Sequence, residues 1–446
     1  MTIGYAIRWV SVLARRHLLH NLLWRRRLAI GAGALLLGFA ALAFAWLADR
    51  ASEGFAGLLA INPWLPAIIT PAGYALIAWI TLKLGPEARG SGIPQVIAAM
   101  KQPARSSHRL ISLKVAFLKP LLTCAALLVG GSAGREGPTV QVSAAIMTRV
   151  HQMLKLPVRS SVLVAGGAAG VAAAFNTPLA GVAFAIEELA SAYEQRMTLL
   201  VMSAVLISGM VSLGIAGDYV YFGAMHDTLS LSSVMVIAPV AGVLGGLAGG
   251  LFSRLVLDVT RRGGLWRPWA RTSPVLWALG CGAVVALVGL ASGNSWGTGY
   301  EAARALIEGD QASPWFGLAK FIATLATALS GIPGGIFAPS LATGAGFGSW
   351  LSELFPEDPG GAVVLLGMIA YFTGVVRAPL TAVIIVSETT ASRGLILPLF
   401  TAAIIADGSA RLVCKERLYH GLAKSFLSPS RDTAPDREIT GSSATS

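Results

Sequence analysis

The stretch Gly130-Gly-Ser-Ala-Gly-Arg-Glu-Gly-Pro-Thr-Val-Gln141 places Arg135 and Glu136 between two long apolar segments. A charged side chain inside a membrane span costs at least a few kcal/mol, and such residues usually mark an ion or proton route. The four glycines and Pro138 predict a break in the helix, which leaves backbone amides free. Because free amides at a helix start bind anions, we expect Glu136 to be either their resident ligand or a gate over them.

The composition of the whole chain is that of a membrane protein. Of its 446 residues, 54% are hydrophobic and 13% are charged, against roughly a quarter charged in a soluble domain. Residues 28–48 form an uncharged run of 21 residues, and about 20 suffice to cross a bilayer. No cleavage site follows this run, which favours an uncleaved span over a signal peptide. We therefore expect an all-α integral membrane protein that crosses the bilayer many times.

The formal charge of +12 comes mainly from loops between the apolar runs, so we do not expect nucleic acid as a partner. The positive-inside rule places these loops in the cytoplasm. The basic segments are residues 25–27, 101–109, 261–271 and 415–417. Acidic loops containing Asp218, Asp227, Glu308 and Asp310 then face outside. Both chain ends are expected in the cytoplasm, and the membrane is expected to be a bacterial inner membrane.

Other chemistry-bearing side chains are sparse. The three cysteines have no paired or metal-ligand spacing, and none of the six histidines lies mid-span beside a partner at ligand spacing. We expect neither a metal nor a cofactor. A membrane-embedded enzyme would need a nucleophile with a base, and a purely structural scaffold would leave the cost of Glu136 without a role.

The chain divides into three expected parts. Residues 1–27 mix apolar residues and arginines at helical spacing, which predicts an amphipathic helix on the inner membrane surface. Residues 28–425 form the transmembrane domain, and residues 426–446 form a cytoplasmic tail expected to be disordered. The expected spans are residues 28–48, 66–84, 110–129, 160–189 with an interruption, 197–213, 234–251, 274–290 and 395–405.

Sequence landmarks recur with an offset of 201 residues. The matching pairs are Gly134 and Gly335, Pro138 and Pro339, Pro178 and Pro379, and Glu187 and Glu388. The similar segments Ser91-Gly-Ile-Pro94 and Ser330-Gly-Ile-Pro333 have a different offset, so they are not part of the 201-residue repeat. Transporters built from two repeats hold their ion where broken helices meet. The offset predicts two related halves, whereas their relative orientation stays open from spacing alone.

Three breaks rich in glycine and proline, at residues 90–94, 134–138 and 334–339, are expected to share one polar site. Irregular backbone at membrane depth is tolerated only where protein buries it or where it lines a cavity. Pro94 suits the first turn of a new helix, whose positive end would face a small anion. The alternative is that the three breaks are packing contacts between helices.

Three ionisable side chains each have a functional and an ordinary interpretation. Glu136 competes with the anion for the free amides, or else forms a salt bridge with Arg135 or Lys119. Glu188 faces the protein interior and relays protons, or else ends a helix in cytoplasmic water. Tyr419 donates its hydroxyl to an anion, or else anchors the chain at the membrane interface.

Four motifs together resemble the CLC family of chloride channels and chloride/proton antiporters. They are Gly90-Ser-Gly-Ile-Pro94, Gly134-Arg-Glu-Gly-Pro138, Gly335-Ile-Phe-Ala-Pro339 and Tyr419, supported by Phe175-Asn-Thr-Pro-Leu-Ala-Gly181 and Val376-Arg-Ala-Pro-Leu380. The resemblance covers residues 60–425. It implies a homodimer with one pore per subunit and an inverted repeat of tilted, broken helices. The short stretch that follows Tyr419 fits the prokaryotic type, which has no C-terminal regulatory domains.

The resemblance also implies roles for individual residues. Chloride would be bound by the hydroxyls of Ser91 and Tyr419 and by the amides of Ile336 and Phe337. Glu136 would be the external gate and Glu188 the internal proton acceptor. The backbone that supports the site would be Gly92, Pro94, Arg135, Gly137 and Gly335.

The expected function is therefore chloride/proton antiport across the membrane, gated by Glu136. Serine at position 91 favours chloride, because proline there accompanies nitrate selectivity in the family. Glu188 favours an antiporter over the alternative, a passive chloride channel gated by voltage or pH. Gln95 departs from the acid that many relatives carry, and little effect on the ion site is expected.

Overall fold

The structure is a computed structural model that describes residues 3–102, 109–189, 195–217, 221–260, 264, 267–310 and 313–427. Within this part, six helices are long and apolar enough to cross a membrane. Large apolar side chains are exposed along these helices, such as Phe39 on the first and Leu287 near the middle of the chain. The predicted tail lies almost wholly outside the described residues, as do Asp218 and parts of the basic segments 101–109 and 261–271.

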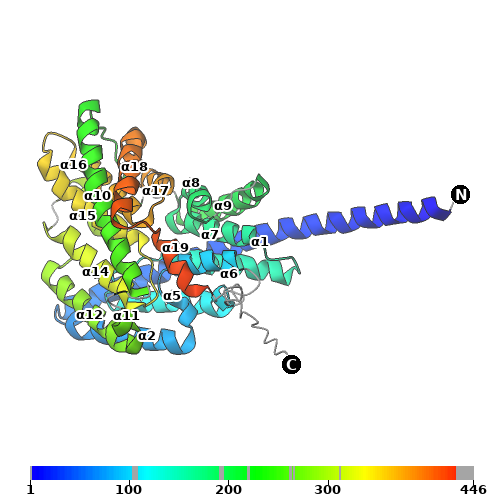
Figure 1. The fold of residues 1–446 in the computed structure, drawn as a ribbon, viewed down its shortest axis with the longest axis horizontal. Coiled ribbons are helices and arrows are strands. Elements are labelled where there is room, and N and C mark those ends of the chain that lie inside the picture. The colour runs from blue at the N-terminus through cyan, green and yellow to red at the C-terminus, as the bar shows by residue number, and fades with distance from the viewer. Residues whose placement is uncertain are drawn as a thin grey trace, which may run out of the picture.

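The helices follow one another with short connections (Figure 1). The first half contains α1 (Ile3–Ile61), α2 (Pro66–Leu84), η1 (Pro86–Ala88), α3 (Ile93–Lys101), α5 (Leu113–Leu128), α6 (Glu136–Met153), α7 (Ser160–Phe175), α8 (Pro178–Phe184), η2 (Ala185–Leu189) and α9 (Gln195–Ala216). The second half contains α10 (Leu231–Thr260), α11 (Arg267–Thr272), α12 (Pro274–Ser292), α13 (Tyr300–Glu308), α14 (Phe316–Ser330), α15 (Phe337–Leu354), α16 (Gly360–Val376), α17 (Pro379–Thr390), η3 (Arg393–Leu395), α18 (Ile396–Val413), α19 (Leu418–Ala423) and η4 (Lys424–Phe426).

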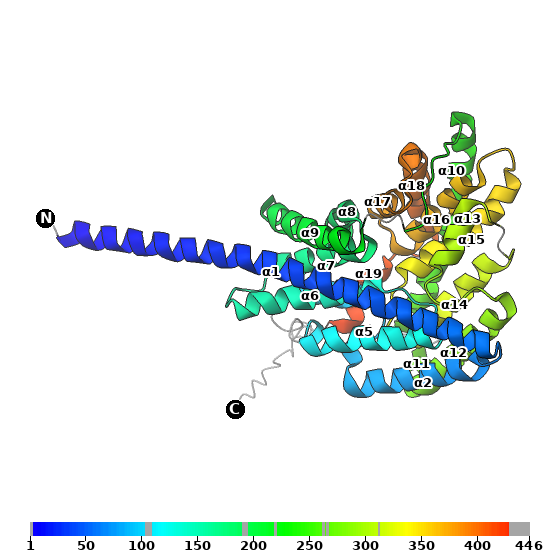
Figure 2. The same cartoon turned by 180° about the vertical axis from the view of Figure 1, so that it is seen from behind.

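The first helix differs from the expectation. The sequence predicts a surface helix followed by a separate span, whereas α1 is one continuous helix of 59 residues. The expected boundary after residue 27 falls inside it without a break, and the apolar span extends over residues 22–61. Figures 1 and 2 both show its N-terminal end projecting beyond the other helices. Residues 25–27 are good helix formers, so nothing local stops the helix at the basic segment.

The two halves repeat in three dimensions with the predicted offset. Helices α6 and α15 begin and end at residues that this offset relates, Glu136 with Phe337 and Met153 with Leu354. Asn176 and Arg377, which it also relates, end α7 and α16 in left-handed conformations with φ of 57° and 61°. The repeat therefore extends beyond its sequence landmarks to the helix ends themselves.

A two-fold relationship between the halves is visible at one pair of residues. Gly134 donates its amide to the carbonyl of Gly335 over 2.8 Å, and Gly335 donates back to Gly134 over 2.7 Å. The two segments run antiparallel across this bridge. Since equivalent residues bond to each other, the axis that relates the halves passes between them. This geometry is that of an inverted repeat.

Glycines allow α10 to approach its neighbours closely. A Cβ atom on Gly245 or Gly249 would come within 2.6 Å of α16, and one on Gly246 would lie 2.5 Å from the carbonyl of Ala406 on α18. Small residues permit such close contact between membrane helices. These glycines therefore serve close helix packing. Helix α16, which Gly245 and Gly249 face, is buried over residues 361–376.

Candidate functional site

The three breaks predicted from glycine and proline meet in space. Gly90 donates its amide to Ile332 over 3.2 Å, and its carbonyl accepts the amide of Gly334 over 3.2 Å. The similar segments 91–94 and 330–333 therefore lie side by side, although the 201-residue offset does not relate them. Gly134 and Gly335 connect the other two breaks. The expectation that the breaks come together is thus confirmed.

The N-termini of three helices belong to this junction. Helices α3, α6 and α15 begin after Gly92, Arg135 and Ile336, and none of these residues caps its helix with a side chain. Pro94 lies in the first turn of α3, as predicted. Uncapped helix N-termini leave backbone amides available and carry partial positive charge. The junction is therefore suited to an anion.

Glycine is required where the breaks touch. A Cβ atom on Gly137 would lie 2.4 Å from the Ser91 hydroxyl oxygen. One on Gly335 would lie 2.9 Å from the carbonyl of Gly134 and 3.1 Å from the amide nitrogen of Gly137. Gly92 has φ of 108°, a conformation that other residues rarely adopt. These contacts bring Ser91 against the start of α6.

Two hydroxyls and one aromatic ring line the junction. The hydroxyl oxygens of Ser91 and Tyr419 are buried, and neither forms a hydrogen bond that satisfies the usual geometry with another described residue. The ring of Phe337 lies 5.9 Å from that of Tyr419 and packs on edge against Phe372. The two hydroxyls are close enough to interact with each other, and a buried hydroxyl normally needs a partner of this kind. Ile336 and Phe337, buried at the start of α15, complete the predicted set.

Glu136 is fully buried on one side of this set. The phenol of Tyr300 donates a hydrogen bond to its Oε1 atom, while its Oε2 atom lies so close to Gly134 that a Cβ there would approach to 2.4 Å. Its carboxylate is thus held over the break between the two halves. The tyrosine was not predicted, because no local sequence pattern links residues 136 and 300.

The predicted alternative of a salt bridge from Glu136 is not what the structure contains. Arg135 instead donates to Asp49 over 2.7 Å and to the hydroxyl of Tyr221. Lys119 donates to the carbonyl of Gly90 over 2.7 Å. Both cations therefore hold backbone or neighbouring side chains in place, and Arg135 supports α6 by binding α1.

Lys119 also has a counterpart in the other half. Lys320, which the repeat offset relates to Lys119, is equally buried and donates to the carbonyls of Ser295, Trp296 and Gly297 over 2.7–3.1 Å. Each lysine holds a loop that precedes a short helix of the site region. A buried ammonium requires such acceptors, which explains why both loops fold inward.

Glu187 and Glu188 have separate environments. Glu188 is buried, and its Oε1 atom lies 3.2 Å from Nδ1 of His420. Glu187 accepts the amides of Leu380 and Thr381 over 3.2 and 2.8 Å at the start of α17. Glu188 therefore faces the protein interior and does not end a helix in open water. Glu187 caps the start of α17.

Tyr419 is close to both buried acids. Its hydroxyl is near enough to interact electrostatically with both Glu188 and Glu136. Glu136, Tyr419 and Glu188 are therefore buried polar groups that interact with one another. Apart from these groups, the surroundings are largely apolar, as the rings of Phe175, Phe184 and Phe372 around Phe337 illustrate.

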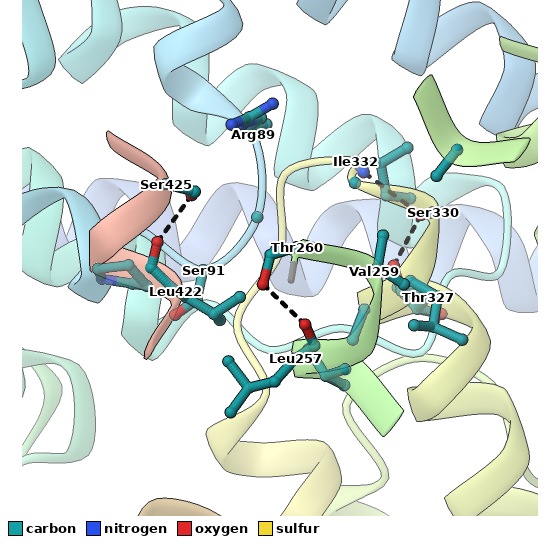
Figure 3. A pocket seen from close by; sticks show the side chains of 18 of the residues that line it. Arg89, Ser91, Leu257, Val259, Thr260, Thr327, Ser330, Ile332, Leu422 and Ser425 are labelled. Atoms are coloured by element: carbon teal, nitrogen blue, oxygen red, sulfur yellow. Dashed lines mark hydrogen bonds between the residues drawn. The ribbon is translucent and has the colours of Figure 1, made fainter. Parts of the chain in front are cut away.

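A cavity of about 490 Å³ reaches this site from one side. Ser91, Ile336 and Tyr419 belong to its wall, and Arg89 and Arg271 line it as well. Figure 3 shows Arg89 and Ser91 in this cavity. Burial, Arg271 and Arg109 lower the pKa of Arg89, which stacks on the ring of Phe426 at 5.0 Å. Clustered cations around a cavity raise the local concentration of anions.

The fold and the buried polar junction are those of a membrane ion-transport protein. The chain belongs to the CLC family: the family described as "Voltage gated chloride channel" matches residues 73–411. It is thus a chloride transporter of that family, whose members are transporters and channels rather than enzymes.

Solved structures share the fold. A slow cyanobacterial Cl⁻/H⁺ antiporter has a TM-score of 0.78 at 24% identity, covering 90% of this chain and 97% of its own. A eukaryotic CLC transporter has a TM-score of 0.72 at 24% identity, covering 90% and 75%. A CLC-type fluoride/proton antiporter has a TM-score of 0.76 at 22% identity, covering 90% and 98%.

Proposed function

We propose that the protein exchanges chloride for protons, with chloride and the Glu136 carboxylate alternating at one site. One observation carries this proposal: the Glu136 carboxylate is buried at the start of α6, and the Tyr419 hydroxyl interacts electrostatically both with it and with the buried Glu188. A carboxylate so close to uncapped helix starts competes with any anion they attract. Protonation of Glu136 removes that competition and so couples the chloride flux to the proton flux.

In this proposal Ser91 and Tyr419 bind chloride through their hydroxyls, and Ile336 and Phe337 bind it through their backbone amides. The aromatic surroundings of Phe337 exclude water, which strengthens each hydrogen bond to the ion. Gly92, Pro94, Gly137 and Gly335 shape the backbone around the ion. Arg135 holds the start of α6 through Asp49.

Glu136 and Glu188 carry the proton in turn. Both acids are buried and interact electrostatically with the Tyr419 hydroxyl, so in this proposal a proton that moves between them passes beside the chloride site. Isolated carboxylates buried in a membrane domain mark proton routes in transporters. A passive chloride channel, the other candidate, would leave the burial of Glu188 without a role.

We further propose the assembly and orientation that the family resemblance implies. The protein is a homodimer with one pore per subunit, both chain ends lie in the cytoplasm, and the membrane is a bacterial inner membrane. The basic segment 25–27 on α1 supports this orientation. Crosslinking in the membrane and protease accessibility of a terminal tag test these two statements.

The deciding experiment uses purified protein in liposomes with a chloride gradient and no proton gradient. Antiport predicts that chloride flow drives protons across the membrane and so builds a proton gradient, and that the reversal potential depends on both ions. Chloride flux without proton movement would establish the passive channel instead. Parallel gradients of nitrate and fluoride report the selectivity of the Ser91 site.

A further inference from the structure

The buried Glu188 needs a route to water, and the structure offers one side chain for it. Both carboxylate oxygens of Glu188 are buried, and neither forms a hydrogen bond that satisfies the usual geometry within the described residues. Nδ1 of His420 lies 3.2 Å from Oε1, the distance of a hydrogen bond or an ion pair. His420 is therefore a titratable group in direct contact with this acid.

One edge of the His420 ring is buried, and another is exposed to solvent. Its side chain is 32% exposed, whereas Nδ1 itself is buried against Glu188. The exposed part of the ring is consequently the part away from Glu188, which includes the edge with Nε2. Imidazole can accept a proton at one nitrogen while it donates one from the other.

The position of the ring is fixed by its neighbours. Tyr419 and His420 are consecutive on α19, so their side chains leave the helix about 100° apart, since a turn holds 3.6 residues. Tyr419 is directed to Phe337, and His420 to Glu188. Arg417 donates to the carbonyl of Glu187 over 3.2 Å, which ties α19 to the segment that carries Glu188.

Glu187, the other candidate for this task, is already engaged. Its two carboxylate oxygens accept the amides of Leu380 and Thr381 and the hydroxyl of Thr381. Protonating it would weaken the cap of α17. In the described part of the chain, Nδ1 of His420 contacts Glu188 and caps no helix.

We propose that His420 relays protons between the adjoining aqueous phase and Glu188. A hydronium ion protonates Nε2, and the Nδ1 proton passes to the Glu188 carboxylate. This leaves neutral imidazole with its proton on Nε2. Rotation of the ring away from Glu188 then brings Nδ1 to water, where loss of the Nε2 proton and gain of one at Nδ1 restore the starting tautomer. The inference rests on the proposed function, in which Glu188 accepts protons from that side.

The test compares wild type, His420→Ala, His420→Gln and Glu188→Gln in the same liposome assay. His226→Ala is the matched control, because His226 is exposed in the loop before α10 and distant in sequence from the site. Proton flux in both His420 variants is expected to fall about tenfold or more, while chloride flux changes less than about twofold. Millimolar imidazole on the α19 side is expected to restore proton flux in His420→Ala and to leave Glu188→Gln unchanged.

The outcomes separate the relay from the antiporter. If Glu188→Gln abolishes proton movement while both His420 variants retain it, the relay is wrong and the antiporter stands. If the His420 variants lose chloride and proton flux in proportion and imidazole restores neither, the residue is structural and the relay is overturned. A wild type that moves no protons overturns the antiporter and, with it, the relay.

Discussion

Tyr300 donates a hydrogen bond to Glu136, although the two residues lie in opposite halves of the repeat. The bond ties the carboxylate proposed as the gate to the first residue of α13. Tyr300 also packs against Tyr221, which contacts Arg135. The gate is therefore connected through aromatic residues to the arginine that anchors its own helix.

Replacing Tyr300 with phenylalanine should make the gate easier to displace. A hydrogen bond to a charged group contributes about 1.5–3 kcal/mol, so apparent chloride affinity should rise about tenfold or more. Isothermal titration of chloride into the purified protein measures this change. In a Glu136→Gln background the same substitution should have little effect, since the charged acceptor is gone. Unchanged affinity in Tyr300→Phe would contradict a holding role for the phenol.

Replacing Glu136 with glutamine should end proton movement while chloride still passes. The amide cannot take up a proton, yet it is close in shape to the protonated acid. Coupled flux in liposomes checks this, with Glu301→Gln as the control, because Glu301 is an exposed acid on α13. Proton pumping that survives in Glu136→Gln would remove this residue from the mechanism.

Replacing Gly137 with alanine should damage the anion site without unfolding the protein. The added methyl group would lie 2.4 Å from the Ser91 hydroxyl oxygen, so Ser91 must move. Chloride affinity is expected to fall about tenfold, which corresponds to about 1.4 kcal/mol. Gly280→Ala is the control, because a Cβ there meets nothing within 4 Å. Normal chloride binding in Gly137→Ala would show that Ser91 does not contact the ion.

Glu187 and Glu388 should each stabilise the other half of the protein. Glu388 accepts the amides of Leu179 and Ala180 over 3.3 and 3.0 Å, as Glu187 does for the start of α17. Each change to glutamine weakens one helix cap and should cost about 1 kcal/mol. Thermal unfolding in detergent should show similar losses that add in the double variant, with the exposed Glu353→Gln unchanged. A loss in only one single variant would contradict the symmetry of the caps.

Much of this architecture was predictable from the sequence. The apolar runs locate spans such as α2 and α12 within a few residues, because the thickness of the bilayer sets their length. Glycine and proline locate the breaks, since they interrupt helices locally. The constant offset between landmarks identifies the two halves, and these landmarks fall on equivalent helix starts in the structure.

Only the tertiary structure decided which residues distant in the sequence contact one another. Sequence spacing left Glu136 with Arg135 or Lys119 as partners, whereas folding gave it Tyr300. It also brought Gly90 beside Pro333, and His420 beside Glu188. Periodicity and turn signals act over a few residues, whereas these contacts join segments far apart in the chain. Such pairs depend on how whole helices pack, and that packing is set by many close contacts at once, for which no local pattern exists.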